Sequence, residues 1–264
     1  MRTTTLTLLL VAVLGNLPLR GQQTPSKTSS PPAAKEKDAK EQDAKAQDAA
    51  ATATNSEKKK AGKKGADNKP AWKSLLAKQG LEGWEVTDFG GQGEVTRSGD
   101  KLVLERGGPL TGINYKKGDF PKENYEIELE AQRLDGSDFL CGLTFPVGDE
   151  FCSLIAGGWG GGVVGLSSVD GYDASENATS LYKAFENNQW YKFRVRVDPE
   201  FITAWIDDKE AIKQERDGHE FSTRIEVYVS QPLGYCAFDS KVAVRNFHWR
   251  PVKPNENSQT SDQP

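Results

Sequence analysis

The sequence predicts an all-β fold in which two antiparallel sheets form a jelly-roll sandwich, preceded by a disordered linker. Three observations support this prediction. Apolar and polar residues alternate with a period of two in several segments between residues 101 and 250. Turn signals rich in Gly and Asp separate these segments at short intervals, without a strand–helix–strand rhythm. Residues 23–70, by contrast, contain almost no apolar side chain larger than alanine, so they cannot build a core.

The N-terminus predicts export. Residues 1–22 begin with Met and a basic residue, continue through an apolar run over residues 6–14 and end near Gly21, which is the pattern of a signal peptide. A buried amphipathic helix is the alternative. The run is too short to cross a bilayer comfortably, so we expect no membrane span and a secreted or periplasmic protein. A linker rich in Ala, Lys, Asp and Glu follows over residues 23–70, the jelly-roll domain occupies residues 71–252, and residues 253–264 form a disordered tail.

Charge and cysteine content exclude several classes. A net charge of −4 and a pI near 5.5 do not indicate the basic character typical of nucleic-acid-binding proteins. A basic cluster over residues 57–69 could touch an anionic surface, although a soluble spacer explains it as well. The three cysteines lack the spacing of a metal site. Cys141 and Cys152 could face each other as a disulfide across the intervening turn, or all three thiols could be free and buried.

One short helix is predicted over residues 72–80, and the rest of the domain reads as strands. The predicted strands cover residues 101–105, 110–115, 124–132, 138–145, 151–157, 190–198, 201–207, 210–215, 223–230 and 242–249. Glycines and valines at 157–165 are interpreted as a further strand that presents Trp159. Residues 197–212 are interpreted as a meander with turns at Pro199-Glu200 and Asp207-Asp208. It would lie on one sheet and leave the other sheet, with its loops, for a ligand.

Alternation assigns faces to these strands. In residues 124–132 the apolar side chains should face the core and the three glutamates should face water, and residues 190–198 repeat the pattern with Lys and Arg. We interpret these charged rows as solvated, with pairing across strands as the alternative. In the last strand, alternation places His248 on the face of Val242 and Val244. A structural role is the better interpretation of His248, and a surface turn position that of His219.

The order of three segments resembles the family named for 3-keto-disaccharide hydrolases. They are NQWYKFRVRV, FITAWIDDKEAI and the closing PLGYCAFDSKVAVRNFHWRPV, and the likeness covers about residues 81–251. The resemblance implies a concanavalin A-like or laminin-G-like jelly roll and, in the GGWGGGVVGLSSVDGYDASEN segment, a variant found in exported proteins of planctomycete-type bacteria. It implies a carbohydrate partner and cleavage of the glycosidic bond of a 3-keto-glycoside. Typical members carry a Glu-x-Gln segment where this chain has Glu150 and Ser153.

Such a cleavage needs a base, because the C3 ketone makes the C2 proton acidic. Asp170, Asp173 and Glu150 are the candidate catalytic carboxylates. The candidate substrate-binding residues are Trp159, which could lie flat against a sugar ring, and Tyr172, Glu176 and Asn177.

Each candidate has a plainer alternative. The acidic loop could be a solvated turn, or its oxygens could bind Ca²⁺, the only cofactor the sequence leaves open. Trp159 could be a core residue. A non-catalytic glycan-binding or surface-interaction module is the alternative function, because jelly rolls carry lectins and enzymes alike. Neither the sugar nor an oligomeric state follows from the sequence.

Overall fold

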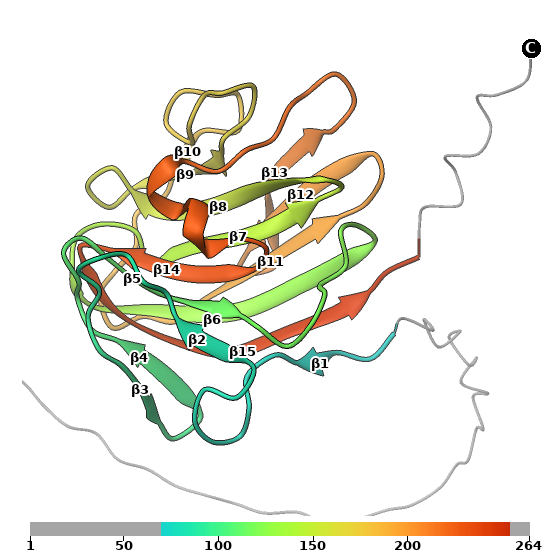
Figure 1. Cartoon of the computed structure of the whole chain (residues 1–264). Coiled ribbons are helices and arrows are strands. Elements are labelled where there is room, and N and C mark those ends of the chain that lie inside the picture. The colour runs from blue at the N-terminus through green and yellow to red at the C-terminus, as the bar shows by residue number, and fades with distance from the viewer. Residues whose placement is uncertain (1–69, 254–264) are drawn as a thin grey trace, which may run out of the picture. The chain divides into compact units, whose positions relative to one another are not determined.

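Two antiparallel sheets face each other in the computed structural model, which describes residues 70–253 (Figure 1). The predicted signal peptide, nearly all of the linker and nearly all of the tail lie outside these residues, so their bounds stay predictions. Within the described residues, no helix has the length and hydropathy needed to cross a membrane. The predicted all-β sandwich is confirmed.

Sheet A has eight strands in the order β13-β12-β11-β6-β15-β4-β3, with β1 paired to β15. Its strands are β1 (Lys73–Ser74), β3 (Val95–Ser98), β4 (Lys101–Leu104), β6 (Tyr125–Gly136), β11 (Tyr191–Val197), β12 (Phe201–Ile206), β13 (Lys209–Glu215) and β15 (Ser240–Pro251). The predicted meander is its β11-β12-β13 edge. Asp207 and Asp208 both have positive φ, 52° and 62°, as a two-residue hairpin turn with the twist of its strands requires.

Sheet B has seven strands in the order β10-β9-β8-β7-β14-β5-β2. Its strands are β2 (Trp84–Val86), β5 (Leu110–Tyr115), β7 (Cys141–Val147), β8 (Glu150–Gly158), β9 (Val163–Ser167), β10 (Leu181–Tyr182) and β14 (Gly234–Phe238). Successive strands along the chain often change sheet, as β5, β6 and β7 do, and this crossing gives the jelly roll its topology. One 3₁₀ helix, η1 (Ile225–Ser230), is described outside the sheets.

The core lies between the sheets because alternate side chains of both point inward. On β6, Ile127 and Leu129 are fully buried and lie opposite Val195 and Phe193 of β11. The predicted period of two is therefore confirmed for both strands. Tyr125 is also buried here, and its hydroxyl donates a hydrogen bond to the carbonyl of Pro146, so its polar end is satisfied inside the core.

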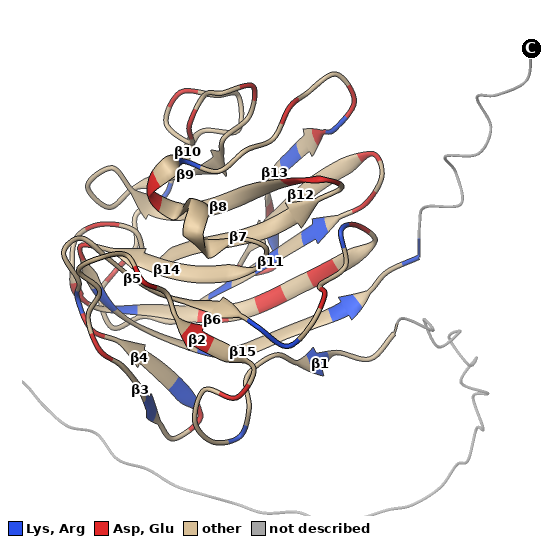
Figure 2. Ribbon diagram, viewed as in Figure 1, with Lys and Arg blue, Asp and Glu red and all other residues tan. Residues whose placement is uncertain are grey.

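The charged rows are paired across strands, which corrects the interpretation that they are merely solvated. Glu126, Glu128 and Glu130 of β6 lie opposite Arg196, Arg194 and Lys192 of β11 and opposite Arg250, His248 and Arg245 of β15. Figure 2 shows the red glutamates banding β6. Charges of one sign on a central strand flanked by the other sign attract from both sides, and so fix the strand register.

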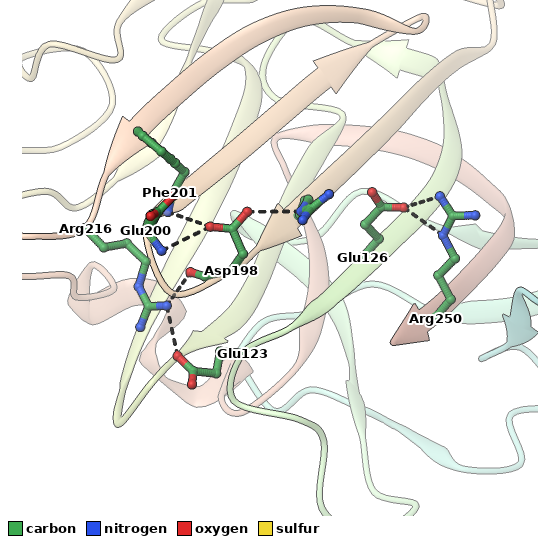
Figure 3. A network of polar contacts seen from close by, with 8 residues as sticks. Glu123, Glu126, Asp198, Glu200, Phe201, Arg216 and Arg250 are labelled. Atoms are coloured by element: carbon green, nitrogen blue, oxygen red, sulfur yellow. Dashed lines mark hydrogen bonds and ion pairs between the residues drawn. The ribbon is translucent and has the colours of Figure 1, made fainter. Parts of the chain in front are cut away.

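The most buried ion pair of this surface joins Glu126 to Arg250, whose side chains are 7% and 12% exposed (Figure 3). The guanidinium of Arg250 also stacks over the ring of Trp72, 4.3 Å from its centre. Both charges are thus held in place by protein groups in a region with little water.

Figure 3 also shows how Asp198 forms the predicted Pro-Glu turn. Its Oδ1 accepts hydrogen bonds from the backbone N–H groups of Glu200, at 3.1 Å, and Phe201, at 2.8 Å. Arg216 donates to the Asp198 carbonyl and pairs with Glu123 at 3.0 Å. An aspartate that caps its own turn in this way stabilises the β11–β12 connection.

The predicted helix over residues 72–80 is wrong. Lys73 and Ser74 form strand β1 against β15, and the N–H of Leu75 donates to the carbonyl of Phe247 at 2.8 Å. The carbonyl of Leu75 accepts a hydrogen bond from the indole of Trp84 at 2.9 Å. The backbone N–H and carbonyl groups here form hydrogen bonds with residues far away in the sequence. This tertiary pairing overrides the weak local helix propensity.

The predicted strand over residues 223–230 is also wrong, because η1 replaces it. Its Ile225 side chain is 86% exposed, whereas Val227 is buried, so the apolar residues do not share one face. The strand that follows, β14, already pairs with β5 and β7 on its two sides. Residues 223–230 therefore have no free sheet edge beside β14 and close into a 3₁₀ turn that crosses the sheet.

A β-bulge corrects the predicted orientation of His248. The register of β15 against β6 shifts between Arg245 and His248, and Asn246 has a φ of 51°. The extra residue reverses the alternation, so Phe247 rather than His248 continues the buried face of Val242 and Val244. His248 lies opposite Glu128 on the charged face.

The cysteines are free and buried. In the β7–β8 hairpin Cys141 pairs with Ala156 and Cys152 pairs with Phe145, so the two thiols are offset by four residues, about 13 Å along the strands. A disulfide needs Cα atoms within about 7 Å. The hypothesis of a Cys141–Cys152 bridge is therefore wrong.

We expect the native chain to resist alkylation by iodoacetamide. Desolvation raises the pKa of Cys152 and of Cys236 to about 12 and raises that of Cys141 well above its usual value, so reactive thiolate is scarce at neutral pH. Mass spectrometry should find no labelled cysteine in the native chain and three in denaturant without reductant. Only one labelled cysteine in denaturant would reveal a disulfide.

Candidate functional site

The outer face of sheet B carries almost no charge. Figure 2 shows β7 and β14 without a red or blue residue, in contrast to β6. The only charged residues of the seven strands are Glu85, in the short edge strand β2, and Glu150, at the start of β8. The ladder aligns Asn114, Thr144, Ser153 and Ser167 in one row across this face, with Gly234 between the first two. A neutral face lined by small and polar residues leaves room for another group to pack on it.

Helix η1 partly covers that face and appears in Figure 1 as the orange coil in front of β7, β8 and β14. Val227 of η1 belongs to a small apolar cluster separate from the main core, together with Leu110, Phe139, Ile155, Ala174 and Cys236. A Cβ on Gly234 would meet the carbonyl oxygen of Ser230 at 2.5 Å, so the end of η1 lies directly on β14. The helix leaves a space between itself and the sheet.

This space is a pocket of about 220 Å³. It is lined by Leu110, Asp138, Phe139, Ile155, Trp159, Ser167, Arg224, Glu226, Val227 and Phe238. Apolar side chains form its floor and η1 forms one wall, while the four polar residues lie among them. A pocket that is mostly apolar with a few fixed polar groups is the usual form of a small-molecule site.

Trp159 lies on the tight turn that joins β8 to β9. The predicted continuous strand at 157–165 is therefore interrupted, because β8 ends at Gly158 and β9 begins at Val163. Trp159 has a φ of 50°, which costs a bulky residue of order 1–3 kcal/mol, and Gly160 and Gly161 continue the turn at positive φ. A Cβ on Gly162 would clash with the ring of Tyr182 at 2.0 Å, so the turn needs glycine there.

The turn holds Trp159 at the pocket, 44% exposed and outside both apolar clusters. It is thus a pocket-lining aromatic and not a core residue. The guanidinium of Arg224 lies 5.9 Å from the centre of its ring.

Asp138 is fixed by backbone donors. Its Oδ1 accepts a hydrogen bond from the N–H of Phe139 at 2.8 Å, and its Oδ2 accepts one from the N–H of Gly160 at 2.9 Å. The buried Arg133 donates to the Asp138 carbonyl at 2.8 Å, which holds the backbone. Within residues 70–253 no cation pairs with this carboxylate, so its charge is positioned but not neutralised.

Arg224 lies across the pocket wall between two carboxylates. Its Nη2 is 2.9 Å from Oε1 of Glu226, and it also pairs with Asp173. The hydrogen bond from Arg224 lowers the pKa of Glu226, and the same contact raises the pKa of Arg224. Arg224 and Glu226 are therefore both charged at neutral pH.

Ser167 brings an unpaired hydroxyl to the pocket. The residue is 1% exposed, and its Oγ has no hydrogen-bond partner among the described residues. Its ladder neighbour Ser153 differs, because the hydroxyls of Ser153 and Thr144 are bonded at 2.8 Å. A buried polar group without a partner costs about 1–3 kcal/mol, which a ligand with a polar atom at this point could recover.

Asp170 lies outside the pocket. Its Oδ2 is 2.7 Å from Nδ1 of His219, and its Oδ1 accepts a hydrogen bond from the N–H of Glu220 at 2.9 Å. That backbone hydrogen bond, followed by the contact with His219, lowers the pKa of Asp170. The aspartate joins the loop after β9 to the loop after β13, where Ser168 and Ser222 exchange two backbone hydrogen bonds.

The other candidates of the acidic loop mostly bind their own loop. Asp173 accepts from the N–H and hydroxyl of Ser175, at 3.0 and 2.7 Å, and reaches the pocket only through Arg224. Asn177 donates to the carbonyls of Leu166, Tyr172 and Asp173 and accepts from Thr179.

Tyr172 and Glu176 are exposed, and Glu150 accepts a hydrogen bond from the N–H of Phe221 at 3.2 Å. No three His, Cys, Asp or Glu side chains gather as metal ligands within the part of the chain that the structure describes.

The structure thus brings Trp159 and, indirectly, Asp173 to the pocket, and leaves Asp170, Glu150 and Glu176 away from its lining. Sequence reasoning missed Asp138, Ser167, Arg224 and Glu226. Of these four residues, only Asp138 stood beside a recognisable sequence pattern, the Asp-Gly turn at residues 135–136. Arg224 was hidden within a predicted strand.

The fold is a jelly-roll β-sandwich with a largely apolar pocket on the outer face of sheet B. Residues 71–250 match the family described as the 3-keto-alpha-glucoside-1,2-lyase-like domain, and the chain belongs to that family. No curated protein matches the sequence.

Solved structures with a similar arrangement include the carbohydrate binding module CBM66 from Bacillus subtilis, with 12% identity over 62% of this chain and 93% of the other and a TM-score of 0.41. The apo Crh5 transglycosylase has 13% identity over 71% and 85%, with a TM-score of 0.48. The metal-free Emp46p carbohydrate recognition domain has 14% identity over 66% and 90%, with a TM-score of 0.45.

Proposed function

We propose that this is an exported protein that cleaves the glycosidic bond of a 3-keto-glycoside in the pocket between η1 and sheet B. The observation that carries the proposal is the convergence of Trp159, Asp138 and Arg224 around one pocket. These groups supply an aromatic platform, a positioned carboxylate and a cation, and family membership points to the substrate class. Secretion through the predicted signal peptide, and a planctomycete-type source, are parts of the proposal that rest on the sequence.

In the proposed reaction the sugar ring stacks on Trp159, and Asp138 accepts the proton from C2. The electron pair of that C–H bond forms the C1–C2 double bond, and the bond between C1 and the glycosidic oxygen breaks. The departing oxygen takes up one proton, which the protonated Asp138 can return, so the proton count balances. Arg224 stabilises the negative charge that develops on the C3 oxygen. Water can add to the unsaturated product afterwards, which completes a net hydrolysis.

The sequence-based candidates enter this proposal differently. Asp173 acts as a positioning residue that holds Arg224. Asp170, paired with His219, and Glu150 stay alternative bases, each outside the pocket lining. The catalytic assignment of Asp173, Asp170 and Glu150 stays a prediction. Substituting each carboxylate separately distinguishes it from the assignment of the base to Asp138.

The test incubates the full chain with methyl 3-keto-α-glucoside and follows release of methanol and of the unsaturated keto sugar by NMR, with and without EDTA. We expect release, and we expect Trp159→Ala to lower kcat/KM by roughly 10-fold, since the contact between the indole and the sugar ring buries apolar area that stabilises the complex by roughly 25 cal/mol per Å². Unoxidised methyl α-glucoside should not react, because its C2 proton is not acidic. A chain that binds the keto sugar without releasing methanol would contradict the proposed cleavage.

A non-catalytic glycan-binding module is the second candidate. One observation favours it: Arg224 is already paired with two carboxylates, which reduces its capacity to stabilise a further negative charge. Binding of α-glucosides that depends on Trp159, without cleavage of any 3-keto-glycoside, is the outcome that this candidate predicts.

A further inference from the structure

The floor of the pocket is unsuited to a sugar ring. The apolar residues that line the pocket are Leu110, Phe139, Ile155, Val227 and Phe238. Four of them belong to the apolar cluster under η1, and Phe238 packs against that cluster. A sugar ring carries hydroxyls around its whole circumference, and each one buried without a partner would lose its hydrogen bonds to water. The polar residues Asp138 and Arg224 and the half-exposed Trp159 offer contacts to only part of a glycoside.

Because the Oγ of Ser167 lacks a partner among the described residues, a ligand in the pocket should carry one hydrogen-bonding atom at this point. Ser167 itself is 1% exposed. Because one hydroxyl can donate one hydrogen bond and accept others, it matches a single oxygen on an otherwise apolar group. An aromatic ring with one hydroxyl combines these two properties.

We propose that the pocket binds the aglycone of an aryl glycoside, with the apolar floor against the aromatic ring and Ser167 bonded to a phenolic oxygen. The inference rests on the proposed function for the sugar, which contacts Trp159 and Asp138 at the pocket mouth. It extends that function by naming the leaving group: an apolar aryl alcohol and not a second sugar.

The first test measures binding to the full chain by calorimetry, with three unoxidised and therefore unreactive ligands: methyl, phenyl and 4-hydroxyphenyl α-glucoside. We expect phenyl α-glucoside to bind roughly 10- to 100-fold more tightly than the methyl compound, from the apolar area that the ring buries. The hydroxyl should tighten binding by roughly a further 5- to 10-fold.

Ser167→Ala tests the phenolic contact. The variant removes a buried hydroxyl that lacks a partner, so it is expected to melt no lower than the parent and to keep the phenyl preference. It should lose the additional gain from the 4-hydroxyl group. Ser153→Ala is the matched control, because Ser153 is the ladder partner of Ser167 but does not line the pocket, and it should retain that gain.

Equal affinity for the methyl and phenyl compounds would overturn the inference, even if methyl 3-keto-α-glucoside is cleaved and the proposed function stands. Absence of binding for all three ligands would also overturn it. Tight binding of the aryl compounds without cleavage of any 3-keto-glycoside would support the aglycone site and contradict the catalytic proposal. If the 4-hydroxyl group of the ligand increases the affinity of Ser167→Ala as much as that of the parent, Ser167 does not bind the phenolic oxygen.

Discussion

Replacing Asp138 by Asn is expected to lower kcat for the cleavage of a 3-keto-α-glucoside by roughly 10²- to 10⁴-fold, the usual contribution of a positioned general base. Asn has nearly the same shape but cannot accept the C2 proton. The KM should change much less, because Trp159 and the apolar floor remain. The measurement is the rate of release of the alcohol under saturating substrate, with binding of the unreactive phenyl α-glucoside as the check on the pocket.

Two matched substitutions show whether the effect belongs to Asp138. Asp170→Asn and Glu150→Gln make the same change from carboxylate to amide outside the pocket lining, and kcat should stay within a few-fold of the parent. Asp138→Asn also loses one of its two backbone hydrogen bonds, because an amide accepts only through its oxygen, so its melting temperature is measured alongside. Loss of activity in Asp170→Asn but not in Asp138→Asn would restore the base that the sequence predicted.

Replacing Glu126 by Leu is expected to destabilise the domain by about 3 kcal/mol or more. The substitution leaves Arg250 charged, 12% exposed and without its carboxylate partner (Figure 3). Stacking over Trp72 would hold the guanidinium in place and hinder its escape to water. The free energy of unfolding from urea titration, followed by tryptophan fluorescence, measures the loss.

Glu130→Leu is the matched control on the same strand and face. Its partner Arg245 is 31% exposed and Glu130 is 24% exposed, so water can solvate the charge that remains. The expected cost is about 1 kcal/mol or less. The double variant Glu126→Leu/Arg250→Met should recover most of the lost stability, since it removes both buried charges. Equal destabilisation by Glu126→Leu and Glu130→Leu would show that burial does not set the cost.

The sequence determined the strands whose alternation needs no distant information. Side chains of β6 and β11 alternate between the core and the outer charged face, as their sequences predict, because a strand presents successive residues to opposite faces. The Asp207-Asp208 turn was also predictable, since Asp tolerates positive φ. Together with the turn spacing, these local rules were enough to predict the sandwich.

Local rules failed where distant segments decide the conformation. Lys73 and Ser74 became strand β1 and not part of a helix because β15 offered partners, and residues 225–230 became η1 because β14 was already paired on both sides. One bulge at Asn246 reversed the face of every residue after it, which alternation alone could not reveal.

The sequence by itself therefore determined the fold class, because hydrophobic alternation and turn residues act over a few neighbours. The tertiary structure alone decided the pocket. Asp138, Trp159, Ser167 and Arg224 come from four separate connections or strand ends, and only the packing of η1 on sheet B brings them around one space. The tertiary structure also decided the role of Asn177, which holds its own loop together. Its amide donates hydrogen bonds to carbonyls that become neighbours only when the loop packs against β9.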